Sequence, residues 1–237
     1  ASKCSSYVFE EGILYTKSRD TAVRASTKLT GDVRIPEGVA SIGAGAFSVC
    51  AGIEHLYLPS SLTDIGEDAF GYCASLKSVS FSEGLALIRP VAFKCCYSLE
   101  TLEFPRSLTE IGEGAFYNCV ELRRVLLNDG LKTVGDGLFA NCTKLGEITL
   151  PESLAEIGEN AFGFDIDREG NYSKHEGFVV KAYPGSAGEK YAKSSKLTVE
   201  TIGCSGAKWL FVVLIGGLLA IGAVLAVILM KKGGKSA

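Results

Sequence analysis

Histidine is scarce in this sequence: His55 and His175 are the two in 237 residues. No two of the eight cysteines are separated by two residues, which is the usual spacing in structural zinc sites. Neither histidine has a cysteine, serine or aspartate at a spacing typical of a catalytic triad. No glycine-rich segment has the strand–GxxxxGK[ST]–helix context of a phosphate loop. We therefore expect no metal, no cofactor and no catalytic residues, and a protein that is not an enzyme.

Basic side chains are also few outside the C-terminus. The chain has 24 lysines and arginines against 27 aspartates and glutamates, a net charge of −3. Without Lys208 and the lysines at 231, 232 and 235, 20 basic residues face 27 acidic ones, a charge near −7. Phosphate backbones are bound through clusters of lysine and arginine, so nucleic acid is not an expected partner.

One long apolar run lies near the C-terminus, at 209–230, where 22 residues carry no charge. As a helix this run would span roughly 33 Å, which matches the bilayer core. Trp209 would lie at one interface, and the lysines of 231–237 make that tail cytoplasmic by the positive-inside rule. We predict a juxtamembrane linker at 204–208 and a single-pass plasma-membrane protein whose repeats are extracellular, with a signal peptide already removed from before Ala1. The alternative is a tail-anchored scaffold with its repeats in the cytosol.

What is abundant is a repeat of 23 residues. Isoleucine or valine precedes each repeated phenylalanine by five positions, and cysteine follows the first five phenylalanines by three. The phenylalanines are Phe47, Phe70, Phe93, Phe116, Phe139 and Phe162. One unit cannot bury its own apolar side chains, whereas stacked units share one continuous core. The repeat therefore predicts a solenoid over residues 31–165.

Within each unit a short strand is followed by a return segment. Val79 and Phe81, two positions apart, would face the core from one strand. Prolines such as Pro59 would end the strands, Ile-Gly pairs would turn the chain, and a short helical turn would bring each phenylalanine inside. Arg89-Pro90 stands where other units have glycine, so we expect that coil to turn differently.

Both ends of the repeat array are predicted to be caps. Residues 1–30 include a hairpin pattern that turns at Glu11-Gly12. Residues 166–203 begin with a polar stretch and then read as a short helix near 186–193 and a strand near 197–202. A polar, atypical last unit is what an open solenoid end requires.

Five cysteines share one position of the repeat: Cys50, Cys73, Cys96, Cys119 and Cys142. Equivalent residues of stacked coils lie ~4.8 Å apart, whereas a disulfide requires Cβ atoms ~3.8 Å apart. We predict buried free thiols in this column. Cys95 should point outward. Cys4 and Cys204 lie outside the repeats, and the pairing of these three cysteines stays open.

The unit Leu108–Cys119, followed by Leu122, Val125 and Leu127, resembles the BspA-like leucine-rich repeat, and residues 182–192 are similar to the terminal cap of that family. The resemblance implies an α/β repeat solenoid, a curved, right-handed leucine-rich-repeat superhelix with a parallel sheet. Here it would be capped at both ends and followed by one transmembrane helix. Members are commonly surface proteins of bacteria and parasitic protists, some with adhesin or matrix-binding roles.

The strand residues between the core columns should point outward, and they vary from coil to coil. Tyr57, Arg124 and Leu126 are residue types that dominate protein interfaces, and His55 and Glu103 lie beside them on the same face. We predict that these five residues bind a protein ligand, from a host or its matrix, as in an adhesin or receptor. Variation is equally expected of an unconstrained surface, so the alternative is a structural coat protein without a specific ligand.

Two sequons are candidate glycan acceptors in a eukaryotic secretory pathway: Asn141-Cys142-Thr143 and Asn171-Tyr172-Ser173. Asn171 is the better placed of the two because its surroundings are loop-like.

Overall fold

The computed structural model describes residues 6–203. The repeats and both caps belong to one compact unit that ends at Thr201. No helix within residues 6–203 is long and apolar enough to cross a membrane. The predicted linker, transmembrane helix and tail lie outside the described residues, as do Cys4 and Cys204.

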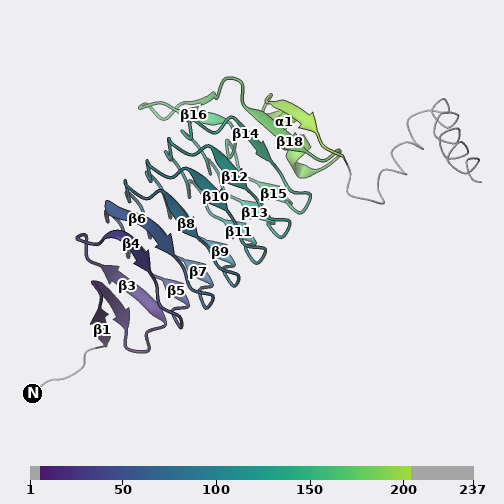
Figure 1. The fold of residues 1–237 in the computed structure, drawn as a ribbon. Coiled ribbons are helices and arrows are strands. Elements are labelled where there is room, and N and C mark those ends of the chain that lie inside the picture. The colour runs from purple at the N-terminus through teal and green to yellow at the C-terminus, as the bar shows by residue number, and fades with distance from the viewer. Residues whose placement is uncertain (1–5, 204–237) are drawn as a thin grey trace, which may run out of the picture. The chain divides into compact units, whose positions relative to one another are not determined.

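The chain winds into stacked coils, each of which contributes two short strands to two separate rows (Figure 1). We call the row with the longer strands the front sheet. Its strands in the repeats are β4 (Thr30–Arg34), β6 (Gly52–Tyr57), β8 (Ser78–Ser80), β10 (Thr101–Glu103), β12 (Arg124–Leu126) and β14 (Glu147–Thr149). Hydrogen bonds join β4 to β6, β6 to β8, β10 to β12, and β14 to the first strand of a pair in the C-terminal cap. In the same row β10 lies beside β8, and β14 lies beside β12.

The second row, here called the rear sheet, is one nine-stranded sheet. In the N-terminal cap it contains β1 (Tyr7–Glu10), β2 (Ile13–Thr16) and β3 (Thr21–Ala25). In the repeats it contains β5 (Ser41–Ile42), β7 (Asp64–Ile65), β9 (Leu87–Ile88), β11 (Glu110–Ile111), β13 (Thr133–Val134) and β15 (Glu156–Ile157). The Ile-Gly pairs expected to be turns thus contribute their isoleucines to strands.

The parallel register equals the repeat length in both sheets. Leu56 pairs with Val79 in the front sheet, and Ile42 pairs with Ile65 in the rear sheet. Every core position therefore lies directly above its equivalent in the previous coil, which confirms the predicted parallel solenoid. The expected helical turns are absent: residues 31–165 contain hydrogen-bonded turns, and the one helix of the described part is α1 (Ala187–Ser194) in the C-terminal cap.

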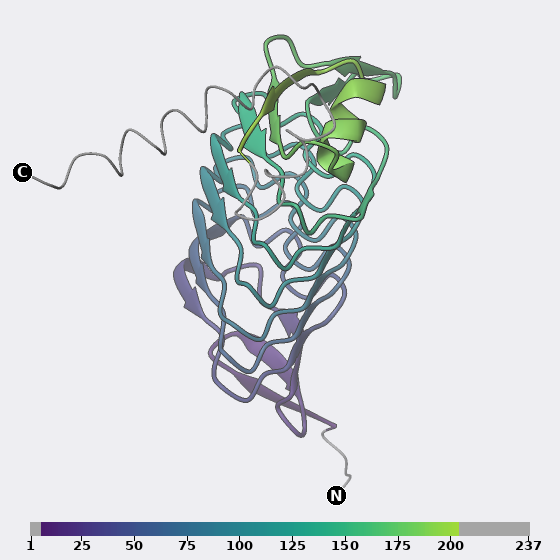
Figure 2. The same ribbon diagram turned by 90° about the vertical axis from the view of Figure 1, so that its right-hand side faces the viewer.

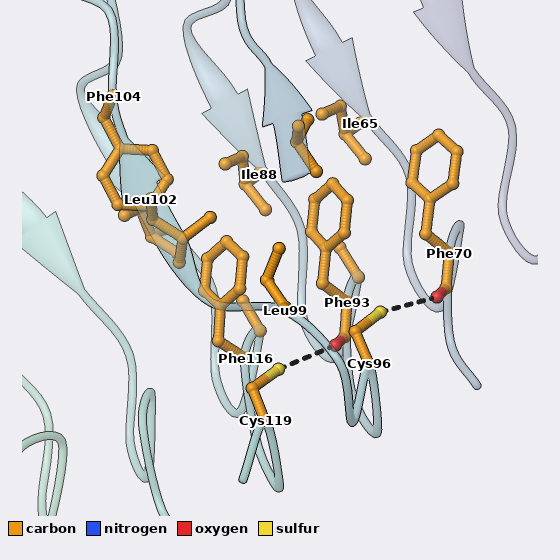
Figure 3. Close-up of a cluster of buried hydrophobic side chains, with 14 of the residues drawn as sticks. Ile65, Phe70, Ile88, Phe93, Cys96, Leu99, Leu102, Phe104, Phe116 and Cys119 are labelled. Atoms are coloured by element: carbon orange, nitrogen blue, oxygen red, sulfur yellow. Dashed lines mark hydrogen bonds between the residues drawn. The ribbon is translucent and has the colours of Figure 1, made fainter. Parts of the chain in front are cut away.

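The six phenylalanines form a ladder of rings through the core, and Figure 3 shows Phe70, Phe93 and Phe116 of this ladder. Centroids of successive rings are 4.9 Å apart for Phe47–Phe70, and Phe93 and Phe116 lie 5.2 Å apart with their planes inclined by 4°. This separation is close to the strand spacing of a sheet. One identical residue per coil can therefore stack along the whole array, which explains the strict repetition of phenylalanine.

The column cysteines form a second ladder beside the rings. All five are buried and free, as predicted. Each thiol donates a hydrogen bond to a backbone carbonyl of the preceding coil: Cys96 Sγ lies 3.3 Å from Phe70 O, and Cys119 Sγ lies 3.4 Å from Phe93 O (Figure 3). Cysteine is thus both a small apolar side chain and a weak donor to a buried carbonyl. Burial raises the pKa of Cys73 to about 12, so the thiol stays protonated at neutral pH.

The prediction that Cys95 points outward is wrong. Cys95 is 4% exposed and has a left-handed backbone with φ of 59°. Asn118, at the equivalent position of the next coil, donates from Nδ2 to Cys95 Sγ at 3.5 Å. The neighbouring coil covers the thiol, and a single repeat does not reveal that contact.

The prediction of a different turn at Arg89-Pro90 is also wrong. Arg89 N donates to Ile65 O at 2.9 Å, as Gly66 N donates to Ile42 O at 2.8 Å in the previous coil. The position that does require a left-handed backbone is two residues later, where Val91 has φ of 51°. The ladder of hydrogen bonds to neighbouring coils holds this turn in the common shape.

Different structures close the two ends. At the N-terminus β1 and β2 form the predicted hairpin, with Glu11 and Gly12 at φ of 46° and 81°, and β3 continues the rear sheet. At the C-terminus β16 (Phe164–Ile166) and β17 (Tyr172–Lys174) form a second hairpin, followed by β18 (Val179–Ala182), α1 and β19 (Thr198–Thr201).

Helix α1 covers the C-terminal end of the coil stack (Figure 2). Its N-cap is Ser186, whose hydroxyl accepts a hydrogen bond from Glu189 N. Tyr191 lies edge-on to Phe162 with ring centroids 5.7 Å apart, and its hydroxyl accepts from Phe162 N and donates to Phe162 O. Tyr191 thus covers the ring of Phe162, the last of the ladder, and also forms hydrogen bonds with the backbone N–H and carbonyl of Phe162.

Candidate functional site

The outward-facing residues of the front sheet form two columns between the core residues. The first column is Asp32, His55, Ser78, Thr101, Arg124 and Glu147, and the second is Arg34, Tyr57, Ser80, Glu103, Leu126 and Thr149. None of these side chains is buried. The sheet places the five predicted binding residues on one face, but spread over three strands, β6, β10 and β12.

In the N-terminal half of this face the predicted residues contact their own neighbours. The Arg34 guanidinium lies 3.7 Å from the centroid of the Tyr57 ring, and the Tyr57 hydroxyl donates to Asp32 Oδ2 at 3.5 Å. His55 Nδ1 lies 2.8 Å from Ser78 Oγ. One face of Tyr57 and one ring nitrogen of His55 are therefore already used within the chain.

A groove of about 580 Å³ lies further along, at the C-terminal ends of β8, β10 and β12. Its lining is Val79, Ser80, Phe81, Glu83, Glu103, Phe104, Pro105, Arg106, Leu126, Leu127, Asn128 and Asp129. The groove brings together two predicted residues, Glu103 and Leu126. Tyr57, His55 and Arg124 do not line it, and Arg124 lies exposed on β12 opposite Thr101.

The part of the groove around Phe81, Phe104 and Leu126 is apolar. Phe104 is buried, and its ring lies 5.4 Å from that of Phe81 and 5.7 Å from that of Phe116 in the phenylalanine ladder. Leu126 is 41% exposed. A partner's apolar side chain would therefore meet a preformed surface, which limits the entropy lost on binding.

Charged and polar groups surround this apolar part. Glu83 accepts backbone hydrogen bonds from Arg106 N at 3.1 Å and Ser107 N at 3.2 Å. Asn128 is buried, donates from Nδ2 to Leu108 O and accepts from Gly130 N. Together with these bonds, Pro105 restricts the loops that carry the groove's charges.

The charges of the groove are three carboxylates and one guanidinium. The carboxylates belong to Glu83, Glu103 and Asp129, and the guanidinium to Arg106. Glu103, Arg106 and Asp129 are exposed and form no ion pair with another of residues 6–203. The groove can therefore offer both charge signs to a partner, with an excess of negative charge.

Sequence reasoning missed most of the groove because it considered only strand residues. Glu83, Arg106 and Asp129 occupy one position of the 23-residue repeat, just after the front strands. Following this column beyond the strand ends would have found them. The apolar groove residue Phe81 was assigned to the core, and it is only partly buried.

Both histidines have a polar partner in the folded chain. Besides the His55–Ser78 contact, His175 Nδ1 lies 3.0 Å from Asp165 Oδ2, at the base of the β16–β17 hairpin. Cys142 lines a small cavity with this pair, but burial raises the pKa of its thiol. A protonated buried thiol is a poor nucleophile. No group of three His, Cys, Asp or Glu side chains in residues 6–203 is arranged to hold a metal ion.

The two sequon asparagines differ in accessibility. Asn141 is half-buried, and Ile166 uses both ends of its amide: Asn141 Oδ1 accepts from Ile166 N at 2.6 Å, and Nδ2 donates to Ile166 O at 3.2 Å. Asn171 is exposed and donates to Asp167 Oδ2. Glycosylation stays a prediction, with Asn171 the more accessible acceptor.

Comparisons with known proteins bear on this architecture. A profile of the BspA-type leucine-rich repeat region matches residues 20–119 in 6 copies. The crystal structure of a T. pallidum leucine-rich repeat protein is 32% identical over 62% of this chain and 78% of that chain, with a TM-score of 0.55. The chain belongs to the BspA-type leucine-rich repeat family.

Two further solved structures have similar folds. A leucine-rich repeat protein from Eubacterium ventriosum is 25% identical, over 66% of this chain and 49% of that one, with a TM-score of 0.52. The pneumococcal vaccine antigen PcpA is 17% identical, over 84% of this chain and 48% of that one, with a TM-score of 0.53. At that identity PcpA supports the fold alone. The comparison with curated proteins gave no significant match.

Proposed function

We propose that this protein is a surface-displayed binding module that holds a segment of a partner protein in the groove of the front sheet. The observation that carries the proposal is a groove on the solenoid core with a mainly polar, charged lining around a smaller apolar part at Phe81 and Leu126. Its volume of about 580 Å³ is within the roughly 300–1,000 Å³ of typical binding pockets. Such a groove could hold a few side chains of an extended segment.

The groove favours a segment that pairs an apolar residue with a basic one. An apolar side chain would pack between Leu126 and Phe81, and burying ~100 Å² of apolar surface there would contribute ~2.5 kcal/mol. A lysine or arginine would lie near Glu103 and Asp129. Arg106 would remain available for a carboxylate or a carbonyl of the partner.

Display outside the cell is part of the proposal, and it is supported by the apolar run at 209–230 with lysines after it. The alternatives remain a surface coat without a ligand and a tail-anchored cytosolic scaffold. Labelling intact cells with a membrane-impermeant lysine reagent separates these locations, because it reaches exposed lysines of the repeats, such as Lys77, only if they face outside.

The binding test uses the full chain in mild detergent against purified matrix proteins by surface plasmon resonance. We expect Leu126→Asp and Arg106→Glu each to weaken binding more than tenfold, which is ~1.4 kcal/mol. Glu156→Gln, on an exposed strand of the rear sheet, is the matched control. The double change Tyr57→Ala with Arg124→Ala measures whether the site extends along the sheet. Equal loss in the control would move the site off the groove, and the absence of any partner would favour the coat-protein alternative.

A further inference from the structure

A second surface, on the turns that follow the rear strands, is rich in tyrosine. Tyr72 and Tyr97 are 44% and 38% exposed, and Tyr117 in the next coil is half-buried. Tyr172 comes from the β16–β17 hairpin and is 43% exposed. We call these four residues the tyrosine patch. None of them lines the groove of the front sheet.

The four tyrosines are neighbours although they come from separate coils and a hairpin. Backbone hydrogen bonds join the turns that carry them: Tyr72 N donates to Lys94 O at 2.8 Å, and Cys95 N donates to Tyr117 O at 2.8 Å. Gly137 makes room for the hairpin: a Cβ atom there would lie 2.9 Å from the Tyr172 hydroxyl oxygen. The turns that carry the first three tyrosines are therefore adjacent along the stack, and the hairpin brings Tyr172 to the end of this row, beside Gly137.

The end of the patch near Tyr172 is negatively charged. Glu113 is exposed, and among residues 6–203 no lysine or arginine forms an ion pair with Glu113 or Asp136. Asp136 Oδ1 accepts a hydrogen bond from Glu159 N at 2.8 Å. Partial burial raises the pKa of Tyr172, and the charges of Glu113 and Asp136 raise it further. A cation is the group that this environment lacks.

The other end of the patch already contains such a cation. Lys94 Nζ lies 3.2 Å from Asp68 Oδ1 and 5.4 Å from the centroid of the Tyr72 ring. A tyrosine ring, a carboxylate and a lysine thus form one cluster within the chain. Tyr117, Tyr172 and Glu113 again combine tyrosine rings with a carboxylate. Here no lysine or arginine among residues 6–203 forms an ion pair with that carboxylate.

We infer that the tyrosine patch is a second interaction surface, which takes an arginine or lysine of a partner polypeptide against Tyr117 and Tyr172, beside Glu113. Tyrosine rings attract cations through their electron-rich faces, and tyrosine contributes a large contact area with little conformational entropy to lose. The unpaired carboxylates make the surface selective for a basic segment. Because this patch and the groove have no residue in common, the inference does not depend on the proposed function.

The test measures binding of a fluorescein-labelled Arg-Ser repeat peptide to the full chain in mild detergent by fluorescence anisotropy, with a Glu-Ser repeat peptide as the charge control. We expect the Arg-Ser peptide to bind, and to bind more weakly as salt screens the carboxylates. Glu113→Gln and Tyr172→Leu should each weaken binding about two- to fivefold. Tyr172→Phe should keep most of the affinity because it keeps the ring.

The matched controls are Tyr7→Leu and Glu156→Gln, which change an equally exposed tyrosine and an exposed glutamate elsewhere. Neither should alter binding of the Arg-Ser peptide. Equal losses in the controls would show attraction to the overall negative charge and would overturn the inference, as would full affinity in Tyr172→Leu. Loss of peptide binding on Leu126→Asp would place the peptide in the groove and overturn the second surface while leaving the proposed function intact. Tyrosine-dependent binding of dextran without binding of the peptide would identify a carbohydrate surface instead.

Discussion

Replacing Phe116 by alanine should destabilise the solenoid severely. Its ring is 0% exposed and contacts three others, with centroids 5.2 Å from Phe93, 5.5 Å from Phe139 and 5.7 Å from Phe104. Truncating a buried phenylalanine typically costs ~3–5 kcal/mol, and aromatic pairs contribute ~0.5–1.5 kcal/mol beyond buried area. Because both neighbouring coils lose a stacking partner, we expect the free energy of unfolding to fall by an amount in the upper half of this range.

Urea denaturation of a fragment of residues 1–203, followed by far-ultraviolet circular dichroism, measures this loss. Phe116→Leu is the internal comparison, because it keeps most of the volume and should cost less than ~1.5 kcal/mol. Phe47→Ala removes a ring at the end of the ladder, which among residues 6–203 stacks on Phe70 alone at 4.9 Å, and it should cost less than Phe116→Ala. A Phe116→Ala variant within ~1 kcal/mol of the parent would refute the ring ladder as the main stabilising element.

Three further predictions concern the thiols and the turns. The pKa of Cys73 is raised from 9.0 to about 12 in the folded chain. Between these pH values the unfolded chain binds fewer protons than the folded chain, so the free energy of unfolding should fall as pH rises, by up to ~1.4 kcal/mol per pH unit. Thermal melts across this range should show a smaller fall in melting temperature for Cys73→Ala. Iodoacetamide should leave the five column thiols unmodified in the native protein at neutral pH, with mass spectrometry after unfolding as the positive control, and linked peptides between adjacent column cysteines would refute the hydrogen-bonded ladder. Val49 is 57% exposed at φ of 67°, and asparagine occupies the equivalent Asn118 and Asn141; Val49→Asn should therefore raise the free energy of unfolding by ~1 kcal/mol, and a lower melting temperature would contradict the assigned backbone strain.

The solenoid could be predicted from the sequence because its register and its repeat are the same quantity. A parallel coil of 23 residues places Phe93 on Phe70 and Cys96 on Cys73, so a periodic sequence directly predicts a stacked core. The N-terminal hairpin was predictable for a local reason, since Glu11-Gly12 has the backbone freedom that a tight turn requires. The rear sheet was missed because its strands in the repeats are two residues long, too short for an alternating pattern.

The candidate site was less predictable because it is formed between coils. Glu103 and Leu126 were found as outward strand residues, but Arg106 and Asp129 belong to the loops that follow. Cys95 was placed outside because the cover provided by Asn118 comes from another coil. The repeat predicts which equivalent positions of neighbouring coils are in contact, but not how deeply each side chain at these positions is buried.

The separation between inward and outward positions of each coil explains how one core can carry two unlike surfaces. The ring ladder and the thiol ladder constrain only inward positions, so any outward column can change without disturbing the register. One outward column changes from Glu83 to Arg106 to Asp129 and forms the edge of the groove, while the turns on the other edge acquire Tyr97 and Tyr117. Each coil offers a few independent positions, and neighbouring coils combine them at the spacing of the sheet. A binding surface of this kind can be altered one coil at a time, because most of the side chains that stabilise the stack lie in the core and do not line the groove.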